Sequence, residues 1–179
     1  MDPDNRLPKD EEKKRYDLHE NDPEDPRYRE FLNQIYDPMI ERLTPGQYGL
    51  DYGSGPGPTL SVMFEEAGFE MNVYDPFYQP DEYVLERSYD FILTTETAEH
   101  FYYPAKDFDL LWNLLHPGGI LGVMTMQLRD LSTFDSWHYR KDDTHVVFYQ
   151  IKTFEWLSKK YDAILEIISD RVVLLHKPE

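Results

Sequence analysis

The spacing of hydrophobic residues alternates along the chain between a period of two, typical of strands, and a period near 3.6, typical of helices. The expected strands are residues 48–52, 70–76, 89–96 and 119–128, and the expected helices are residues 28–43, 59–69, 104–119 and 153–161. Because strands and helices follow one another in turn, this order predicts an α/β fold with a mostly parallel sheet.

Two further apolar runs, at 163–169 and 171–177, end the chain. The residues between their apolar parts, Asp170 and Arg171, are too few for a crossover helix, so we expect an antiparallel hairpin there. Within the first expected helix, Pro38 lacks a backbone donor and is expected to kink or split it.

The first 30 residues differ from the rest in being dense in charge, proline and asparagine. The stretch "ENDPEDPRY" is typical of turns rather than of core. We therefore divide the chain into a charged arm, residues 1–30, and a domain, residues 31–179.

The composition of the chain argues against several classes of binding partner. The chain has 179 residues, no cysteine and a net charge of −17. A nucleic acid or an anionic membrane surface is a poor partner for such an acidic chain, because binding phosphates requires basic patches. No apolar stretch is long enough to span a membrane or to form a signal core, which together with the absence of cysteine favours a cytoplasmic protein.

A glycine-rich stretch, "LDYGSGPG" at residues 50–57, follows the first expected strand. Gly53, Gly55 and Gly57 alternate there, and such spacing lets a bound molecule approach the backbone closely. The stretch lies at the carboxyl edge of the sheet, where open α/β sheets bind ligands. Asp75, at the end of the second expected strand, is placed to accept hydrogen bonds from ribose hydroxyls.

The glycine-rich stretch matches neither of two common nucleotide-binding sequence patterns, the dinucleotide pattern and the P-loop. Counted from Gly53, the dinucleotide pattern G-x-G-x-x-G/A reaches Pro58, which disfavours a nicotinamide oxidoreductase. The P-loop pattern is absent from the sequence.

Several motifs resemble those of class I S-adenosylmethionine-dependent methyltransferases, in the same order. These are "LDYGSGPG", "VYDP", "TTETAEHF", "LHPGGILGVMT" and the terminal hairpin, over about residues 48–179. The resemblance implies a Rossmann-like methyltransferase sandwich and S-adenosylmethionine as cofactor. Only 13 residues separate Asp75 from Tyr89, where the family usually has a further strand and helix. We therefore expect a fold reduced at this point, with one short sheet edge.

The resemblance also assigns cofactor contacts by position. The methionine part would lie near Asp51, Gly53 and Gly55, with Gly57 in the same loop, and the ribose on Asp75. The adenine would lie beside Tyr74, Pro76 and Phe77, and Thr95 and Glu96 would line the pocket. Carboxylates and aromatic rings also suit the positive sulfonium of this cofactor.

The arm and the stretch "WHYRKDDTHVVFY" resemble one branch of small bacterial methyltransferases. In class I enzymes the amino-terminal segment often folds over the cofactor, so Tyr16 and His19 are candidates for a lid. A charged arm exposed to solvent is the alternative.

Histidine is the candidate general base, because its pKa lies near neutrality. His100 follows the third expected strand at the substrate-facing edge, whereas His138 and His145 lie in an aromatic stretch that suits a cap over the acceptor. Asp143 to His145 also fits a local hydrogen-bonded turn. Asp142, Asp143 and His145 could in principle contribute to a metal site, but such clusters are usually solvated turns, so we expect no metal.

The expected function is therefore methyl transfer from S-adenosylmethionine to a small-molecule acceptor, with the acceptor aligned with the sulfur for in-line displacement. The aromatic residues of the cap favour a partly apolar acceptor. The alternative is a module that binds S-adenosylmethionine without catalysis, as a sensor or a regulatory subunit.

Overall fold

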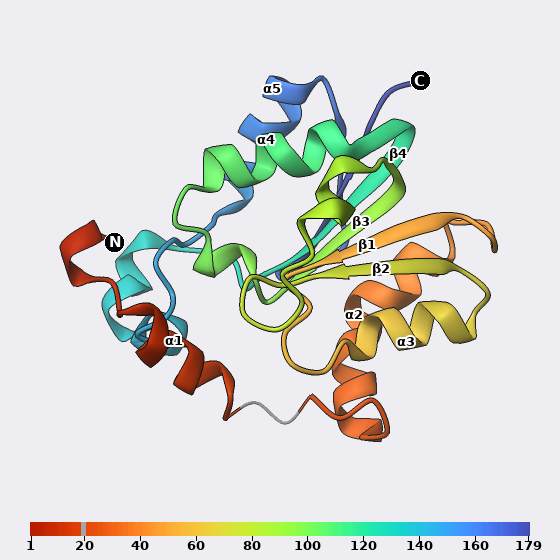
Figure 1. Ribbon diagram of the computed structural model, residues 1–179. Coiled ribbons are helices and arrows are strands. Elements are labelled where there is room, and N and C mark those ends of the chain that lie inside the picture. Colours follow the sequence, from red (N-terminus) through yellow and green to blue (C-terminus); the bar gives the residue numbers. More distant parts are fainter. Residues whose placement is uncertain (19–20) are drawn as a thin grey trace.

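A six-stranded sheet forms the centre of the protein in the computed structural model, which describes residues 1–18 and 21–179 (Figure 1). Its strands lie in the order β2-β1-β3-β4-β6-β5. Their bounds are β1 Tyr48–Tyr52, β2 Glu70–Tyr74, β3 Tyr89–Thr95, β4 Leu115–Met124, β5 Ile164–Ile167 and β6 Val172–His176.

The first four strands are parallel, and the last two form the antiparallel pair that the short connection predicts. In β1, Leu50 is in register with Asn72 of β2 and with Ile92 of β3. Leu121 of β4 faces Leu175 of the antiparallel β6. The expected Rossmann-like methyltransferase fold, with a mostly parallel sheet and a terminal antiparallel hairpin, is confirmed.

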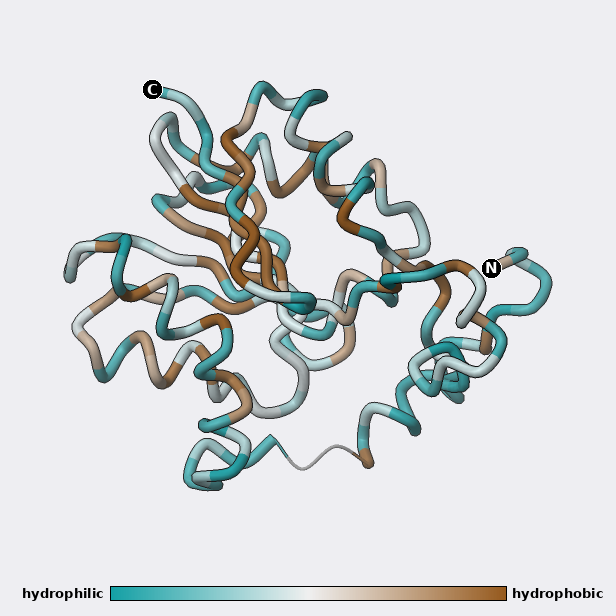
Figure 2. Tube along the Cα trace, turned by 180° about the vertical axis from the view of Figure 1, so that it is seen from behind, coloured by the Kyte–Doolittle hydropathy of each residue, from teal (hydrophilic) through white to brown (hydrophobic). Residues whose placement is uncertain are grey.

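Helices cover both faces of this sheet (Figure 1). Helices α2 (Pro26–Ile40) and α3 (Thr59–Glu66) pack on one face, and α4 (Pro104–Leu114) and α5 (Ile151–Tyr161) on the other. Successive strand residues point to opposite faces, so Leu121 packs in the core under α4 and α5 while its neighbour Ile120 packs under α2 and α3. Figure 2 shows that hydrophobic residues are concentrated in the central strands.

The sheet is short at the edge where the sequence predicts a reduction. Strand β2 is the edge strand, and the segment between it and β3 holds the short 3-10 helix η2 (Glu82–Glu86). Beside the cavity described below, this segment turns back at once through paired backbone hydrogen bonds between Asp75 and Gln79.

Several helix and strand boundaries differ from the sequence prediction, most of all around the Pro-Gly-Gly stretch. Strand β4 begins at Leu115 and ends at Met124, so the apolar residues up to Leu128 continue beyond it, and α4 ends at Leu114 before the Pro-Gly-Gly stretch. Helix α2 continues through Pro38 instead of splitting, and ends two residues later at Ile40.

The arm contains structure that the sequence did not predict. A short 3-10 helix, η1 (Pro3–Asn5), precedes helix α1 (Lys9–Tyr16), which lies beside the carboxyl ends of the strands rather than on the sheet (Figure 1). Arg6 donates to the carbonyl of Tyr102 at 3.1 Å, and the amino terminus donates to the carbonyl of Val146 at 2.6 Å. The arm is mostly hydrophilic (Figure 2).

The segment between β4 and α5 faces the arm across the same edge. It contains two short 3-10 helices, η4 (Leu131–Ser136) and η5 (His138–Lys141), and a third, η3 (Ala98–His100), follows β3. Among the described helices, none is both long and apolar enough to cross a membrane.

Candidate functional site

A cavity of about 980 Å³ opens where β1, β2 and β3 end, beneath the arm. This volume is at the upper end of the range of roughly 300–1,000 Å³ for small-molecule sites. Most of the residues predicted to hold the cofactor line it, namely Tyr16, Asp51, Gly53, Gly55, Gly57, Asp75, Pro76, Phe77, Thr95 and Glu96. The three candidate histidines, His100, His138 and His145, line it as well.

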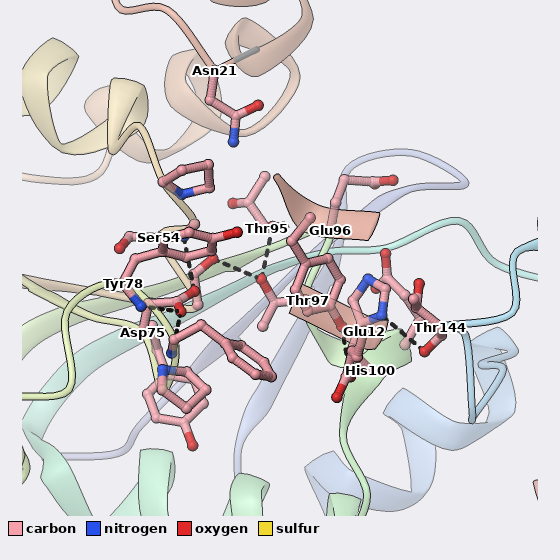
Figure 3. Close-up of a pocket in the computed structure, with 18 of the residues that line it drawn as sticks. Glu12, Asn21, Ser54, Asp75, Tyr78, Thr95, Glu96, Thr97, His100 and Thr144 are labelled. Atoms are coloured by element: carbon pink, nitrogen blue, oxygen red, sulfur yellow. Dashed lines mark hydrogen bonds between the residues drawn. The ribbon is translucent and has the colours of Figure 1, made fainter. Parts of the chain in front are cut away.

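The glycine loop needs glycine for steric reasons. Gly53 has φ +83°, and a Cβ built there would lie 2.1 Å from Cγ2 of Thr97. The hydroxyl of Thr97 lies 3.0 Å from the carbonyl oxygen of Gly53 and 2.9 Å from that of Thr95, and its one hydrogen can be donated to either (Figure 3). At Gly57 a Cβ would lie 1.9 Å from the carbonyl oxygen of Asn21. The loop is therefore pressed between the end of β3 and the arm.

Asp75 organises the turn around the loop. Its carboxylate accepts hydrogen bonds from the backbone N–H groups of Gly55 at 3.0 Å, Phe77 at 2.8 Å and Tyr78 at 3.1 Å. These donors use part of the capacity of a carboxylate, which has about four lone-pair sites. Asp75 is thus fixed in position and retains acceptor sites for a ligand.

Asp51 is the most deeply buried carboxyl group of the loop. Its side chain is 3% exposed and accepts one hydrogen bond, from the Ser61 hydroxyl at 3.1 Å. Burial raises the pKa of Asp51 to about 7, although the Ser61 hydrogen bond opposes the shift, and Asp75 raises the pKa further. A cation in the cavity would favour the ionised carboxylate.

Two buried hydroxyl groups in the cavity wall find no hydrogen-bond partner within the described part of the chain, the Oγ of Ser54 and the Oγ1 of Thr95. Buried polar groups are normally hydrogen-bonded. These hydroxyls, in the loop and at the end of β3, therefore fit a polar ligand in the cavity.

Tyr74 lies differently from what the family pattern implies. Its ring stacks on Tyr52 at 5.2 Å between centroids instead of lining the cavity, and its carbonyl accepts from the N–H of Gly53 at 2.7 Å. Phe77 does line the cavity, and its ring packs against Tyr16 with centroids 5.5 Å apart. The predicted adenine contact of Tyr74 therefore has no counterpart in the cavity wall.

The carboxylates of Glu96 and Glu99 are neighbours just after β3. Glu96 has the left-handed backbone φ of 47°, which is uncommon outside glycine and marks a constrained position. Burial and the neighbouring carboxylate of Glu99 raise the pKa of Glu96, while Arg171, 3.5 Å away, and Tyr139 oppose the shift. Glu99 is 1% exposed and accepts from the hydroxyls of Thr125, at 2.8 Å, and Tyr139.

His100 and His145 lie side by side, with ring centroids 4.9 Å apart. The Nδ1 of His100 lies 2.9 Å from the carbonyl of Thr144 (Figure 3), and the Nδ1 of His145 lies 2.7 Å from the carbonyl of Tyr139. Since a carbonyl only accepts, both Nδ1 atoms donate. Burial lowers the pKa of His145, and the positive form of His100 lowers it further.

His138 lies apart from this pair, exposed at the rim. A local hydrogen-bonded turn forms here, but it starts at Asp142 rather than at Asp143: Asp142 accepts from the N–H of Thr144 at 2.9 Å and from its hydroxyl at 2.6 Å. Asp143 forms an ion pair with Arg15 at 3.1 Å.

The arm supplies residues that sequence reasoning missed. Glu12 is 5% exposed and accepts from the hydroxyls of Tyr16, at 2.8 Å, and Tyr102, at 3.0 Å. Asn21 extends its amide into the cavity above the glycine loop (Figure 3). The candidate lid residue His19 lies outside the described residues. A glutamate in a charged helix carries no sequence signal of burial, whereas Glu99 could have been suspected from its place in "TTETAEHF".

Comparison with known families gives one match over most of the chain. The family model described as a methyltransferase domain matches residues 25–166. Among curated protein sequences, none shows significant similarity to this chain.

Solved structures with the same fold include several methyltransferases. One is a putative S-adenosyl-L-methionine-dependent methyltransferase from Methanococcus maripaludis, with 15% identity, 94% of this chain and 92% of that chain covered, and a TM-score of 0.60. A putative methyltransferase from Bacillus halodurans has 17% identity, coverages of 76% and 71%, and a TM-score of 0.54. A phosphoethanolamine N-methyltransferase from Haemonchus contortus, solved with S-adenosylhomocysteine, has 14% identity, coverages of 80% and 52%, and a TM-score of 0.55.

Proposed function

The chain belongs to the methyltransferase-domain family and is a class I S-adenosylmethionine-dependent methyltransferase, and on this premise we propose that it methylates a small-molecule acceptor inside the cavity. The size and the covered position of the cavity are the observations that support a small-molecule acceptor. Its volume of about 980 Å³ is enough for a nucleoside cofactor with a small acceptor beside it, and the arm and the segment 131–145 stand over it.

The cofactor would be held by the glycine loop and the two aspartates. Asp75 would accept from the ribose hydroxyls through its remaining lone pairs, and Pro76 and Phe77 would lie against the adenine. The unpartnered hydroxyls of Ser54 and Thr95 support a polar ligand at this place, because its donors and acceptors would satisfy them. Asp51 would face the positive charge of the methionine part.

When bound, S-adenosylmethionine supplies an electrophilic methyl group on a positively charged sulfur. The residues of this chain orient the reacting partners, because methyl displacement requires near-attack distance and alignment more than it requires a catalytic group. We assign the acceptor to the side of the cavity lined by Glu96, His100 and His145. His100 lies on the opposite side of Thr97 from Asp75 (Figure 3). Of the three candidate histidines, His100 is half-buried and His145 is buried, and a hydrogen bond to a backbone carbonyl orients each ring, as contact with an acceptor requires.

The arm, residues 1–30, would act as the lid of this cavity. Its helix α1 contacts both sides of the opening: Tyr78 donates to Asp17 at 2.7 Å on one side, and Tyr102 donates to Glu12 on the other. These contacts favour the lid over the alternative of an arm exposed to solvent.

Calorimetric titration with S-adenosylmethionine, S-adenosylhomocysteine and NAD tests the cofactor, with the variant Asp75→Asn. We expect the first two to bind and NAD not to bind, and the variant to weaken binding at least about tenfold by removing a charged acceptor. Asp81→Asn is the matched control, because Asp81 also accepts a backbone N–H, from Tyr83 at 3.0 Å, but lies outside the cavity.

The acceptor class is tested next with a panel of small amines, phenols and carboxylic acids, alongside a peptide and an RNA. Formation of S-adenosylhomocysteine with a small molecule supports the proposal. Binding of the cofactor without turnover of any acceptor would favour the non-catalytic module, and turnover of the macromolecules alone would overturn the small-molecule assignment.

A further inference from the structure

Three side chains at the acceptor side of the cavity form a group that the methyl-transfer chemistry does not require. Potential ligand atoms of Glu99, His100 and His145, one from each, all lie within 4.8 Å of one another. We propose that these three residues bind one divalent transition-metal ion, with Zn²⁺ the ion that best suits two imidazoles and a carboxylate. This departs from the sequence prediction, which expected no metal.

The orientation of the two imidazoles supports the site. Each donates its Nδ1–H to a backbone carbonyl, of Thr144 for His100 and of Tyr139 for His145. These two hydrogen bonds fix the tautomer of each ring, so that Nε2 carries no hydrogen and its lone pair is free to bind a metal ion. Metal-binding histidines almost always have such a partner on the other ring nitrogen, because it holds the ring and increases its basicity.

The surroundings of Glu99 support it as well. A buried carboxylate is normally paired with a cation or bound to a metal, and no cationic side chain within the described part of the chain forms an ion pair with Glu99. The nearby Arg171 pairs with Glu96 instead. The hydroxyls of Thr125 and Tyr139 hold the two oxygens of Glu99 and leave further lone pairs on each.

The distances among Glu99, His100 and His145 also suit a shared ion better than direct hydrogen bonds between these side chains. Among the described residues, neither histidine forms a hydrogen bond or ion pair with Glu99, although the three groups are close. In a tetrahedral Zn²⁺ site, ligand atoms about 2.0–2.2 Å from the metal lie roughly 3.3–3.6 Å from one another. The ligand atoms of the three side chains, which lie within 4.8 Å of one another, would therefore approach by at most roughly 1.5 Å to complete the site.

Three protein ligands leave a position of Zn²⁺ open to the cavity. An acceptor oxygen or nitrogen would take this position, in which case the ion and not an imidazole contacts the acceptor. This last step rests on the proposed function, whereas metal binding itself does not.

The test measures metal binding by the full-length chain. After dialysis against a chelator, the protein is titrated with Zn²⁺ in competition with a chromophoric chelator, and separately with Co²⁺, whose visible absorption reports imidazole and carboxylate ligation. We expect one ion per chain, and an affinity lowered at least about tenfold in each of Glu99→Gln, His100→Asn and His145→Asn. His116→Asn, which replaces an exposed histidine at the start of β4, is the matched control and should bind like the wild type.

Two results would overturn the inference: no Zn²⁺ or Co²⁺ binding at about 100 μM, or binding that the three variants leave unchanged. Circular dichroism and melting temperature show whether each variant is folded, and Glu99→Gln preserves shape if a histidine variant unfolds. Titration of the metal-free protein with S-adenosylhomocysteine separates the two proposals. Cofactor binding without metal binding would reject only the metal site. Metal binding without cofactor binding would reject only the proposed cofactor site.

Discussion

Tyr16 packs the edge of its ring against His100, with the centroids 5.3 Å apart, although the two residues come from the arm and from the end of β3. The same tyrosine ring packs against Phe77, after β2, at 5.5 Å. Tyr16 therefore joins the two sides of the cavity opening. Its hydroxyl donates to the buried carboxylate of Glu12, which holds the ring in this place.

Loss of the Tyr16 ring should open the cavity. In Tyr16→Ala we expect S-adenosylhomocysteine to dissociate about tenfold faster, because each aromatic pair contributes about 0.5–1.5 kcal/mol. Stopped-flow fluorescence measures this rate. Tyr16→Phe keeps both ring contacts and loses only the hydrogen bond to Glu12, so its rate should change much less. Equal rates in Tyr16→Ala and the wild type would show that the arm does not close the cavity.

Gly53 should tolerate no side chain. Gly53→Ala forces a Cβ to within 2.1 Å of the Thr97 side chain at a φ of +83°, and we expect the free energy of unfolding to fall by about 3 kcal/mol or more. Gly46→Ala is the matched control, because Gly46 has φ +90° but nothing within 4 Å of the built Cβ, so it should lose only about 1–2 kcal/mol. Urea denaturation compares the two.

A double variant tests whether the clash with Thr97 causes the loss of stability in Gly53→Ala. Thr97→Ala, which removes the crowding methyl and hydroxyl, should recover part of the stability lost in Gly53→Ala when the two are combined. If the double variant is no more stable than the sum of the single variants predicts, the clash with Thr97 is not the cause.

An ion pair between helix α2 and the edge strand β5 should contribute modestly to stability. Arg42, just after α2, donates to Glu166 through two nitrogens, and these hydrogen bonds lower the pKa of Glu166. The folded pKa is thus below the unfolded one, so the stabilisation exists above about pH 4.5 and is lost as the pH falls through the folded pKa.

We therefore expect Arg42→Met to lower the free energy of unfolding by about 0.5–1 kcal/mol at pH 7 and by less at pH 3. Arg27→Met is the control, because Arg27 is 89% exposed in its pair with Asp25 and should change stability by only a few tenths of a kcal/mol. A loss in Arg42→Met that is equal at both pH values would show that packing of the arginine stem, and not the charge, is responsible.

The sequence predicted the sheet, and it placed the glycine loop and Asp75 together at one edge of it, because both depend on local patterns. Alternating apolar residues define the strands, and the glycines with Asp75 follow the strands whose carboxyl ends meet at one edge. The same logic placed His100 at this edge.

Other parts of the cavity wall could not be predicted in the same way, because their residues meet only through the fold. Glu12 and Asn21 come from a hydrophilic arm with no pattern that indicates burial. His145 reaches His100 across 45 positions of sequence through backbone contacts of a segment without regular structure. Tyr74 lies at the end of β2, as its motif indicates, but its ring stacks on Tyr52 and does not line the cavity.

Asp51 should make the protein less stable as the pH rises. Its folded pKa of about 7 is above the unfolded value of about 4, so the folded state binds more protons between these values, and the free energy of unfolding falls from about pH 4 to pH 7. Asp51→Asn keeps an acceptor for the Ser61 hydroxyl without the charge. Relative to this variant, the wild type should lose roughly 2–4 kcal/mol over that range, as measured by urea denaturation at several pH values.

The same titration should appear in cofactor binding. A positive sulfonium binds better to the ionised carboxylate, so the affinity for S-adenosylmethionine should rise about tenfold from pH 6 to pH 8, with proton release on binding. Calorimetry in buffers of different ionisation enthalpy measures both effects. Glu96, whose pKa burial also raises, is the competing group, and Glu96→Gln should retain the pH step that Asp51→Asn abolishes. A step that survives in Asp51→Asn would assign the titration to Glu96 instead.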